Sequence, residues 1–324
     1  MVVASLPDVD VRQLAALVAV ADHGTFSAAA RALYTVQSNV SGHVAKLERE
    51  LGVVLIDRTG GGLTDEGERV VERARRVLQE MDDIAADIAS LDHDVSGDAR
   101  IGVIGTTGRW LMPQLLAKVE ARHPRVHPII AEGNTTSIVS GVLSGQLNAA
   151  IVHLPIDDPE LLVEPLFAED LFLLVPTRHP LQAALTDDVM SLARLHEVPL
   201  LLPPKGTALR RVLDRAAAAA GVTLRAQAEI DGVPLLSSLA IDGFGAAISP
   251  ATATPRDPNG RFARVNVPEL PRRVVALIRR RRPAASAATN AVAEILAEVI
   301  AAHAHEQPGV HIGPAAFPSL PTRG

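Results

Sequence analysis

The sequence predicts a multi-domain α+β protein with three parts: a small N-terminal helical domain, one long helix and a larger C-terminal α/β domain. A chain of 324 residues is long enough for two or three domains, each with its own hydrophobic core. Apolar residues follow a helical period in short stretches, then a heptad period, and from residue 100 they alternate between short strands and helices. These changes of pattern suggest the domain boundaries.

Residues 1–63 are expected to form a winged helix-turn-helix. Two short amphipathic helices are predicted over residues 10–22 and 25–33, and a third over residues 36–51. Three helices in about fifty residues are typical of a helix-turn-helix. The stretch VVLIDRTGGGLT predicts two short strands around a glycine-rich tip, which is a wing. The buried stripe of the third helix is expected to comprise Val36, Val40, Val44, Leu47 and Leu51.

Residues 64–92 predict one long helix that pairs with the same helix of a second chain. Its apolar residues alternate spacings of four and three across three heptads, as in a coiled-coil seam. The alternative is a helix packed on its own domain, but eleven acidic residues lie between residues 63 and 98 and indicate an exposed helix. The expected dimerisation seam comprises Val70, Ala74, Val77, Met81, Ile84, Ile88 and Leu91.

Residues 93–99 are expected to be a hinge, and residues 100–303 a second folded domain. Strand and helix patterns alternate from RIGVIG onward, which predicts a largely parallel sheet with helices on both faces. Residues 304–324 are rich in proline and glycine, so we expect a disordered tail.

The composition excludes several classes of protein. The chain has no cysteine, so it can form neither disulfides nor thiolate metal sites, and a cytoplasmic location is expected. No segment is apolar for long enough to span a bilayer. The formal charge of −6 would disfavour nucleic acid, but residues 63–98, with eleven acidic residues against four arginines, account for all of it.

The predicted third helix carries uncharged polar side chains at its exposed start, where a solvated face usually carries Lys and Glu. Such side chains can read base edges in a major groove, although the alternative is that they only cap the helix and its turn. Basic side chains nearby are candidates for phosphate contacts. The expected DNA-binding residues are Thr35, Gln37, Ser38, Asn39, Ser41 and, for phosphates, Arg31, His43, Lys46 and Arg58.

The stretch FSAAARALYTVQSNVSGHVAKLERELGVVLIDRTGGGLTDEGERV resembles the N-terminal part of LysR-type transcriptional regulators. This resemblance extends over the chain up to about residue 304. It implies a C-terminal domain with two lobes, similar to type 2 periplasmic binding proteins, with an effector between the lobes. Lobe I is expected at about 100–163 and 266–303, and lobe II at about 164–265. Two departures are Thr35-Val36, where many members have Val-Ser, and Asn148, where Asp is common.

The stretch RIGVIGTTGRW allows two interpretations. A dinucleotide-binding enzyme would use the glycines and Glu132, but the spacing G-x-x-G-x-x-G lacks the paired G-x-G that lets the backbone approach a pyrophosphate. A sensor would use polar residues at helix starts, which favour an anion, although each can also be a simple helix cap. The resemblance to LysR-type regulators implies that the starts of these helices face the cleft between the lobes. The expected effector-binding residues are therefore Thr106, Thr107, Asn134, Thr135, Thr136, His153, Pro204 and Thr207.

The sequence therefore predicts a sequence-specific DNA-binding transcriptional regulator controlled by a small, anionic effector. A dimer, and by resemblance a tetramer, would bind an interrupted inverted repeat in double-stranded DNA. No catalytic set, metal site or cofactor is expected. The alternative is a cytosolic solute-binding protein or enzyme whose helical N-terminal domain only contacts other proteins.

Overall fold

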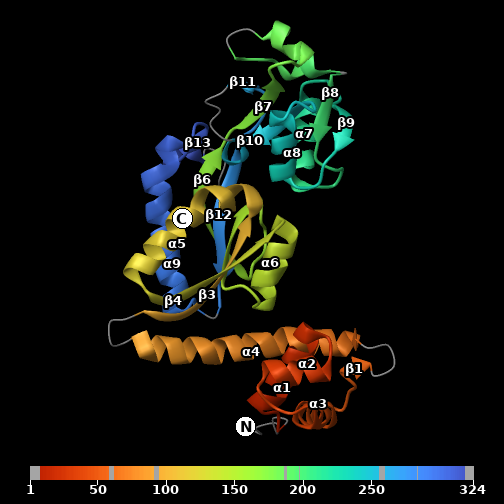
Figure 1. The fold of residues 1–324 in the computed structure, drawn as a ribbon, viewed down its shortest axis with the longest axis vertical. Coiled ribbons are helices and arrows are strands. Elements are labelled where there is room, and N and C mark those ends of the chain that lie inside the picture. Colours follow the sequence, from red (N-terminus) through yellow and green to blue (C-terminus); the bar gives the residue numbers. More distant parts are fainter. Residues whose placement is uncertain are drawn as a thin grey trace.

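The computed structural model describes residues 8–57, 62–90, 95–185, 188–196, 198–254, 260–282 and 284–317. The N-terminal helices lie at one end of the molecule, one long helix separates them from a first lobe, and a second lobe lies at the far end (Figure 1). Helical and mixed α/β parts follow each other along the chain, as the predicted fold class requires.

Three helices and a two-strand hairpin make up the N-terminal domain. Helix α1 begins with a capping box, in which the Asp10 carboxylate accepts from the backbone N–H of Arg12 and Gln13 and the Gln13 side chain accepts from Asp10 N–H. It ends at Gly24, whose φ of 73° suits glycine. The elements are α1 (Val11–His23), α2 (Phe26–Ala32), α3 (Gln37–Leu51), β1 (Ile56–Asp57) and β2 (Gly62–Leu63).

The predicted buried stripe of α3 is wrong at its first residue. Val40, Val44 and Leu47 are fully buried, but the side chain of Val36 is 60% exposed. Val36 is the N-cap, and its extended backbone (φ −97°, ψ 150°) takes it off the helical stripe. The core of this domain is therefore built without it.

Helix α4 (Asp65–Ser90) is the predicted long helix, and its predicted seam divides into two parts. Ala74 is buried and Val70 packs against the N-terminal core, because the first half of α4 lies along α1. The prediction is therefore wrong for Ala74, whereas Val70, which is only half-buried, stays a prediction. Leu91 lies outside the described residues. The exposed seam residues are Val77, Met81, Ile84 and Ile88.

The C-terminal domain has two mixed sheets, one in each lobe. Lobe I has the strand order β13-β6-β12-β5-β3-β4 and lobe II the order β11-β7-β10-β8-β9. Strands β3, β4 and β5 are parallel, as are β8, β9 and β10, while the other pairings are antiparallel. The prediction of a largely parallel sheet thus holds for only part of each lobe.

Lobe I comprises β3 (Ser96–Ile104), α5 (Gly105–Arg122), β4 (Arg125–Gly133), α6 (Thr135–Ser144), β5 (Ala149–His153), β6 (Leu161–Glu169), β12 (Arg273–Arg280), α9 (Ala287–His303) and β13 (Val310–His311). Lobe II comprises β7 (Leu171–Pro176), η1 (Pro180–Ala184), η2 (Leu192–Leu195), β8 (Pro199–Leu202), α7 (Ala208–Ala219), β9 (Arg225–Glu229), α8 (Val233–Ile241), β10 (Ala246–Pro250), η3 (Ala251–Ala253) and β11 (Phe262–Asn266).

The chain crosses between the lobes at Asp170 and again between β11 and β12. The predicted boundary at residues 163/164 is too early, because all of β6 pairs in the lobe I sheet. The predicted boundary at 265/266 falls within β11, the last strand of lobe II. Sequence pattern could not assign β6 and β11 to a lobe, since only pairing decides the sheet to which a strand belongs.

Two further predictions about order are wrong. Within the expected hinge 93–99, residues 96–99 form the start of β3 and pair with β4, while residues 93 and 94 are outside the described part. Within the expected disordered tail, β13 pairs with β6, and the Gln307 side-chain N–H₂ donates to the carbonyl of Ala251 at 2.6 Å. The chain between α9 and β13 requires glycine at position 309, where φ is 84°. A Cβ on Gly309 would also lie 2.5 Å from the Phe172 ring.

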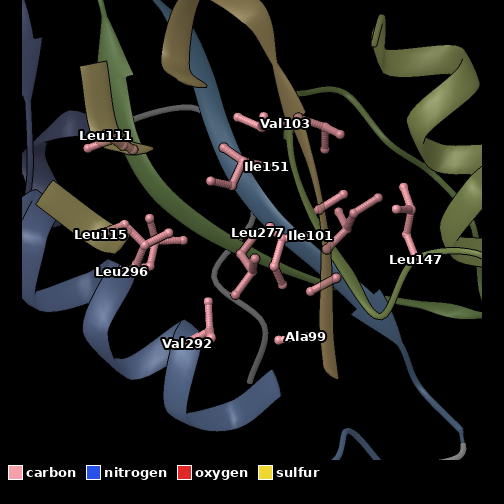
Figure 2. Packing of buried hydrophobic residues seen from close by; sticks show 14 of the residues in the cluster. Ala99, Ile101, Val103, Leu111, Leu115, Leu147, Ile151, Leu277, Val292 and Leu296 are labelled. Atoms are coloured by element: carbon pink, nitrogen blue, oxygen red, sulfur yellow. The ribbon is translucent and has the colours of Figure 1, made fainter. Parts of the chain in front are cut away.

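The core of lobe I lies between the sheet and helices α5 and α9 (Figure 2). Figure 2 shows side chains of β3, β5 and β12 facing those of the two helices. On the other face of the sheet, the absence of a side chain at Gly102 lets α6 pack closely. A Cβ on Gly102 would lie 2.7 Å from Ile138 Cγ2 and from Leu147 Cδ1. The core residues labelled include Ile101, Val103, Leu111, Leu115, Ile151, Leu277, Val292 and Leu296.

Asn148 keeps the local backbone of lobe I hydrogen-bonded. Its side-chain Oδ1 accepts from Arg100 N–H at 2.8 Å, and its own backbone N–H donates to Arg100 O at 2.8 Å. Asn148 therefore provides hydrogen-bond partners for the backbone N–H and C=O of Arg100, just before β3 begins to pair with β5.

Candidate functional site

The exposed start of α3 carries the polar residues expected to contact DNA. Gln37, Ser38 and Asn39 are exposed and Ser41 is half-buried, while the opposite face packs into the core. Helix α3 ends at Gly52, whose φ is 70°. The helix thus presents uncharged donors and acceptors on one surface and anchors them through Val40, Val44 and Leu47.

Two side-chain hydrogen bonds orient this surface. Ser27 Oγ donates to Gln37 Oε1 at 2.8 Å, which ties α3 to the first turn of α2. Asn39 Nδ2 donates to Thr35 Oγ1 at 3.0 Å. Thr35 therefore binds the Asn39 side chain instead of capping the helix backbone. No side chain caps α3, because its N-cap residue is Val36.

A hollow of about 660 Å³ lies beside Gln37, between α3 and the hairpin. Its walls come from α1, α2, α3, the hairpin and the first turn of α4, so all five elements contribute to one concave surface. The polar and glycine residues that line it are Gly24, Thr25, Ser27, Gln37, Ser41, Asp57, Gly62 and Glu68.

The described basic residues expected to contact phosphates lie on two helices, α2 and α3. Arg31 is exposed on α2, and His43 is half-buried on α3. Lys46 Nζ lies 3.9 Å from the Asp8 carboxylate, so its charge is directed toward the start of α1. Arg58 lies outside the described residues.

Lobe I rests directly on α4 (Figure 1). Arg100 Nη1 on β3 donates to Gln79 Oε1 on α4 at 3.0 Å, and Nη2 pairs with Asp98 at 2.8 Å. Gly145, at the end of α6, lies so close to α4 that a Cβ on it would be 3.1 Å from Arg76 Cγ. A hollow of about 250 Å³ borders this contact. The long helix is therefore linked to lobe I by a polar contact and a close backbone approach.

Thr106 and Thr107 lie in the first turn of α5 but do not cap it. The N-cap is Ile104, and the two threonine side chains are buried, with Thr107 completely so. Within the part of the chain that the structure describes, neither hydroxyl has a hydrogen-bond partner. Since buried hydroxyls are rarely left unsatisfied, these two are candidates for ligand contacts.

Asn134 and Thr207, in contrast, act as helix caps. Asn134 Oδ1 accepts from Ser137 N–H at 2.9 Å at the start of α6. Thr207 Oγ1 donates to Pro204 O at 2.9 Å and caps α7 through Arg210 N–H. Because the Asn134 amide oxygen and the Thr207 hydroxyl already have these hydrogen-bond partners, neither needs a ligand to satisfy it. Of the flanking pair at the start of α6, Thr135 is half-buried and Thr136 is exposed.

The start of α5 faces the other lobe. A Cβ at Gly105 would lie 3.4 Å from Pro234 Cγ of helix α8 and 2.3 Å from Glu132 Oε1. Gly105 therefore brings the end of β4 and a helix of lobe II to one point. The carboxylate of Glu132 thus lies beside Gly105, the first residue of α5, which makes that helix end less favourable for a second anion.

A buried ionic cluster lies where β5, β6 and β12 reach the crossing between the lobes. Glu169 Oε2 accepts from the hydroxyl of Thr252 at 2.7 Å and from its backbone N–H at 3.0 Å. Arg273 Nη1 lies 3.9 Å from Glu169 Oε1. Both of these facing atoms, and Nδ1 of the neighbouring His153, are buried without a hydrogen-bond partner among the described residues.

Burial controls the charges of this cluster. It lowers the pKa of His153 well below its usual range, and the positive charge of Arg273 lowers it further. Burial also raises the pKa of Glu169, against the opposing effect of Arg273, and lowers the pKa of Arg273 itself. His153 is therefore neutral in the folded protein.

Sequence reasoning found His153 but missed Glu169, Arg273 and Thr252. Glu169 and Arg273 are partners in the register between β6 and β12, 104 positions apart in the sequence, so no local spacing connects them. It also missed Ser27. The signal for Ser27 was available, since a serine in the first turn of a helix beside the recognition helix can donate across the turn.

Comparison with known proteins identifies the family. A family model described as the LysR substrate binding domain matches residues 92–301, and one described as a bacterial regulatory helix-turn-helix protein of the lysR family matches residues 11–68. The chain belongs to the LysR family. It is a LysR-type DNA-binding transcriptional regulator with a C-terminal effector-binding domain, which confirms the expected family and the expected role as a DNA-binding regulator. The anionic character of the effector stays a prediction.

Among similar proteins, a probable hydrogen peroxide-inducible genes activator of Streptomyces viridosporus is 33% identical over 300 residues, covering 89% of this chain and 93% of that one. The dual regulator OxyR of Escherichia coli is 28% identical over 275 residues, covering 84% and 89%. A full-length OxyR from Pseudomonas aeruginosa, solved with one cysteine replaced by aspartate, has a TM-score of 0.69 at 26% identity, covering 90% and 94%.

Full-length CbnR in complex with its target DNA shares the fold, with a TM-score of 0.64 at 24% identity, covering 90% of this chain and 99% of that one. The relatives are transcriptional regulators rather than enzymes. The helix-turn-helix match overturns the alternative in which the N-terminal domain serves only protein contacts. Within the described ranges, none of the helices combines the length and apolar character that a membrane span requires.

Proposed function

We propose that this cytoplasmic regulator binds an interrupted inverted repeat as a dimer and that a small polar effector between its lobes alters the geometry of binding. The observation that supports the DNA contact best is the start of α3, where Gln37, Ser38 and Asn39 are exposed and Gln37 is oriented by Ser27. In the major groove, a glutamine carboxamide can both donate to and accept from adenine. Gln37 is therefore the proposed base-reading residue.

The proposed dimer forms through the second half of α4. Val77, Met81, Ile84 and Ile88 are between 44% and 65% exposed and follow heptad spacing. Two recognition helices related by a dyad would read half-sites separated by roughly 34 Å or a multiple of it. Pairing of dimers into a tetramer is part of the same proposal.

The proposed effector is bound without covalent chemistry. Solved relatives include the aspartate variant of OxyR from Pseudomonas aeruginosa and a serine variant of OxyR from Corynebacterium glutamicum bound to hydrogen peroxide, each with a cysteine replaced. The present chain has no cysteine. A response through thiol oxidation is thus excluded for this chain.

The buried hydroxyls of Thr106 and Thr107 and the buried Arg273 support a polar ligand with an anionic group. Because the Glu132 carboxylate lies at the N-terminus of α5, we assign the anionic group to the side of Arg273. Helix α5 lies against η3, whose Thr252 binds the Glu169 carboxylate beside Arg273. The threonines and the ionic cluster therefore border the same junction between the lobes.

The contact of lobe I with α4 is the proposed route from effector to DNA. Arg100 joins β3 to Gln79 of α4, and α5 follows directly after β3. A change in the angle between the lobes would act on the same strand that holds α4. Coupling requires only that the effector bind one arrangement better than the other.

DNA binding is tested by fluorescence anisotropy with DNA from upstream of the coding region and with a genomic fragment pool, at near-physiological salt with excess random competitor. We expect saturable binding that Gln37→Ala weakens by about 1–3 kcal/mol, while non-specific binding stays nearly unchanged. Equal loss of both kinds of binding would contradict base reading by Gln37.

The effector site is tested by a thermal-shift screen of small mono- and dicarboxylates against the whole protein. We expect a stabilising carboxylate whose effect is lost in Thr107→Val, which removes only the buried hydroxyl. Thr223→Val, at an exposed threonine, is the matched control. Stabilisation by uncharged apolar compounds alone, or by carboxylates equally in both variants, would refute the proposed site.

A further inference from the structure

Val36 has an unusual environment for an apolar residue. It stands at the N-cap of the recognition helix, its side chain is 60% exposed, and the residues after it, Gln37 to Asn39, are all polar and exposed. The buried stripe of α3 begins one turn later at Val40, so Val36 adds nothing to the core. Neither packing nor solubility accounts for a valine at this position.

Valine at this position also lowers the stability of the helix. Ser, Thr, Asp and Asn are the preferred N-cap residues because their side chains accept from the first backbone N–H groups of the helix. No side chain performs this role in α3, since the nearby Thr35 hydroxyl accepts from the Asn39 side chain. A residue that weakens its helix on a DNA-reading surface points to a contact made by the valine itself.

DNA offers one apolar group in the major groove, the C5-methyl group of thymine. Helix-turn-helix proteins place the N-terminal residues of the recognition helix at base edges. We propose that the Val36 side chain packs on a thymine methyl group and so selects an A·T pair next to the base contacted by Gln37. This rests on the proposed placement of α3 in the major groove.

A protein partner is the competing occupant of this surface. Leu33 is 38% and Tyr34 98% exposed in the same turn, so the apolar area does extend beyond Val36. The polar run from Gln37 to Asn39 directly beside Val36 nevertheless suits base edges better than an apolar protein surface. If a protein covered this turn, changing Val36 would leave DNA selectivity unchanged.

The test compares methyl groups on the protein and on the DNA. Binding sites are first selected from a randomised pool with the full-length protein. Each thymine of the selected half-site is then replaced by deoxyuridine, which removes only the C5-methyl group. We expect one position in each half-site at which this replacement weakens wild-type binding about four-fold, and at which Val36→Ala shows no such loss.

Two variants sharpen the result. Val36→Thr keeps one methyl group and should remain sensitive to deoxyuridine at that position. Val54→Ala removes a valine that is 62% exposed outside the helices of this domain, and it should respond like the wild type. Specific binding with equal deoxyuridine sensitivity in wild type and Val36→Ala overturns the role of Val36 alone. Failure to select any site refutes the DNA-contact proposal as a whole.

Discussion

Lowering the pH should destabilise lobe I through His153. Its folded-state pKa lies well below its usual range because the ring is buried beside Arg273, while the unfolded value is about 6.5. Below about pH 6.5 the unfolded chain binds a proton that the folded protein does not, so stability is lost as the pH falls. Between pH 7.5 and 5.5 this one group accounts for at most about 1.4 kcal/mol of stability, the value for a folded-state His153 that binds no proton in this range.

Trp110 provides the assay. It is the only tryptophan in the chain, and its ring meets Phe167 edge-to-face at 5.3 Å, so its fluorescence reports the packing of lobe I. Urea unfolding of the whole protein followed by Trp110 fluorescence at the two pH values gives the change in stability. His153→Gln should remove most of this change, whereas His127→Gln, at a side chain that is 74% exposed, should not.

The stability contribution of the neighbouring Glu169 changes with pH in the direction opposite to that of His153, so wild type and variants must be compared. Burial raises the pKa of Glu169, so its contribution is largest at low pH and is lost as the pH rises through its folded-state pKa, opposite to His153. Wild type, His153→Gln and His127→Gln all contain Glu169, so its pH-dependent contribution largely cancels when their changes in stability are compared. Equal pH dependence in wild type and His153→Gln would refute the assignment of a buried, neutral His153.

Three further changes test other parts of the structure. Ser27→Ala should weaken specific DNA binding several-fold in anisotropy titrations because it frees the Gln37 carboxamide, and it should have no additional effect in Gln37→Ala. Arg273→Met should lower the urea stability of lobe I by about 3–5 kcal/mol, because it leaves Glu169 buried and unpaired, and Glu169→Gln in the same chain should restore part of it. Ile84→Asp should convert dimers to monomers in sedimentation velocity, and an unchanged dimer would exclude the α4 seam.

The N-terminal domain shows how much local sequence can determine. Helix α1 begins at a capping box around Asp10 and ends at Gly24, and α3 ends at Gly52. These signals act between residues a few positions apart, so they can be read without the rest of the chain. The polar start of α3 was predicted for the same reason. Val36 was misplaced because periodicity does not show which residue leaves the helical backbone.

The candidate effector site was only partly visible in the sequence. Thr106 and Thr107 were expected at the start of α5, but whether each was a cap or an unsatisfied hydroxyl depended on how the helix began. Glu169 and Arg273 could not be connected at all, because the register of β6 against β12 brings them together.

By itself the sequence determined the family, most of the order of helices and strands, and the surface of α3 that faces outward, because these follow from interactions within a few turns of chain. The tertiary structure decided the rest. It buries Val71 of α4 in the core of the chain's own N-terminal domain, directs Arg100 onto Gln79, and holds the segment after α9 against the crossing between the lobes. Each of these contacts joins distant segments, and burial and strand register are defined only once the chain has folded.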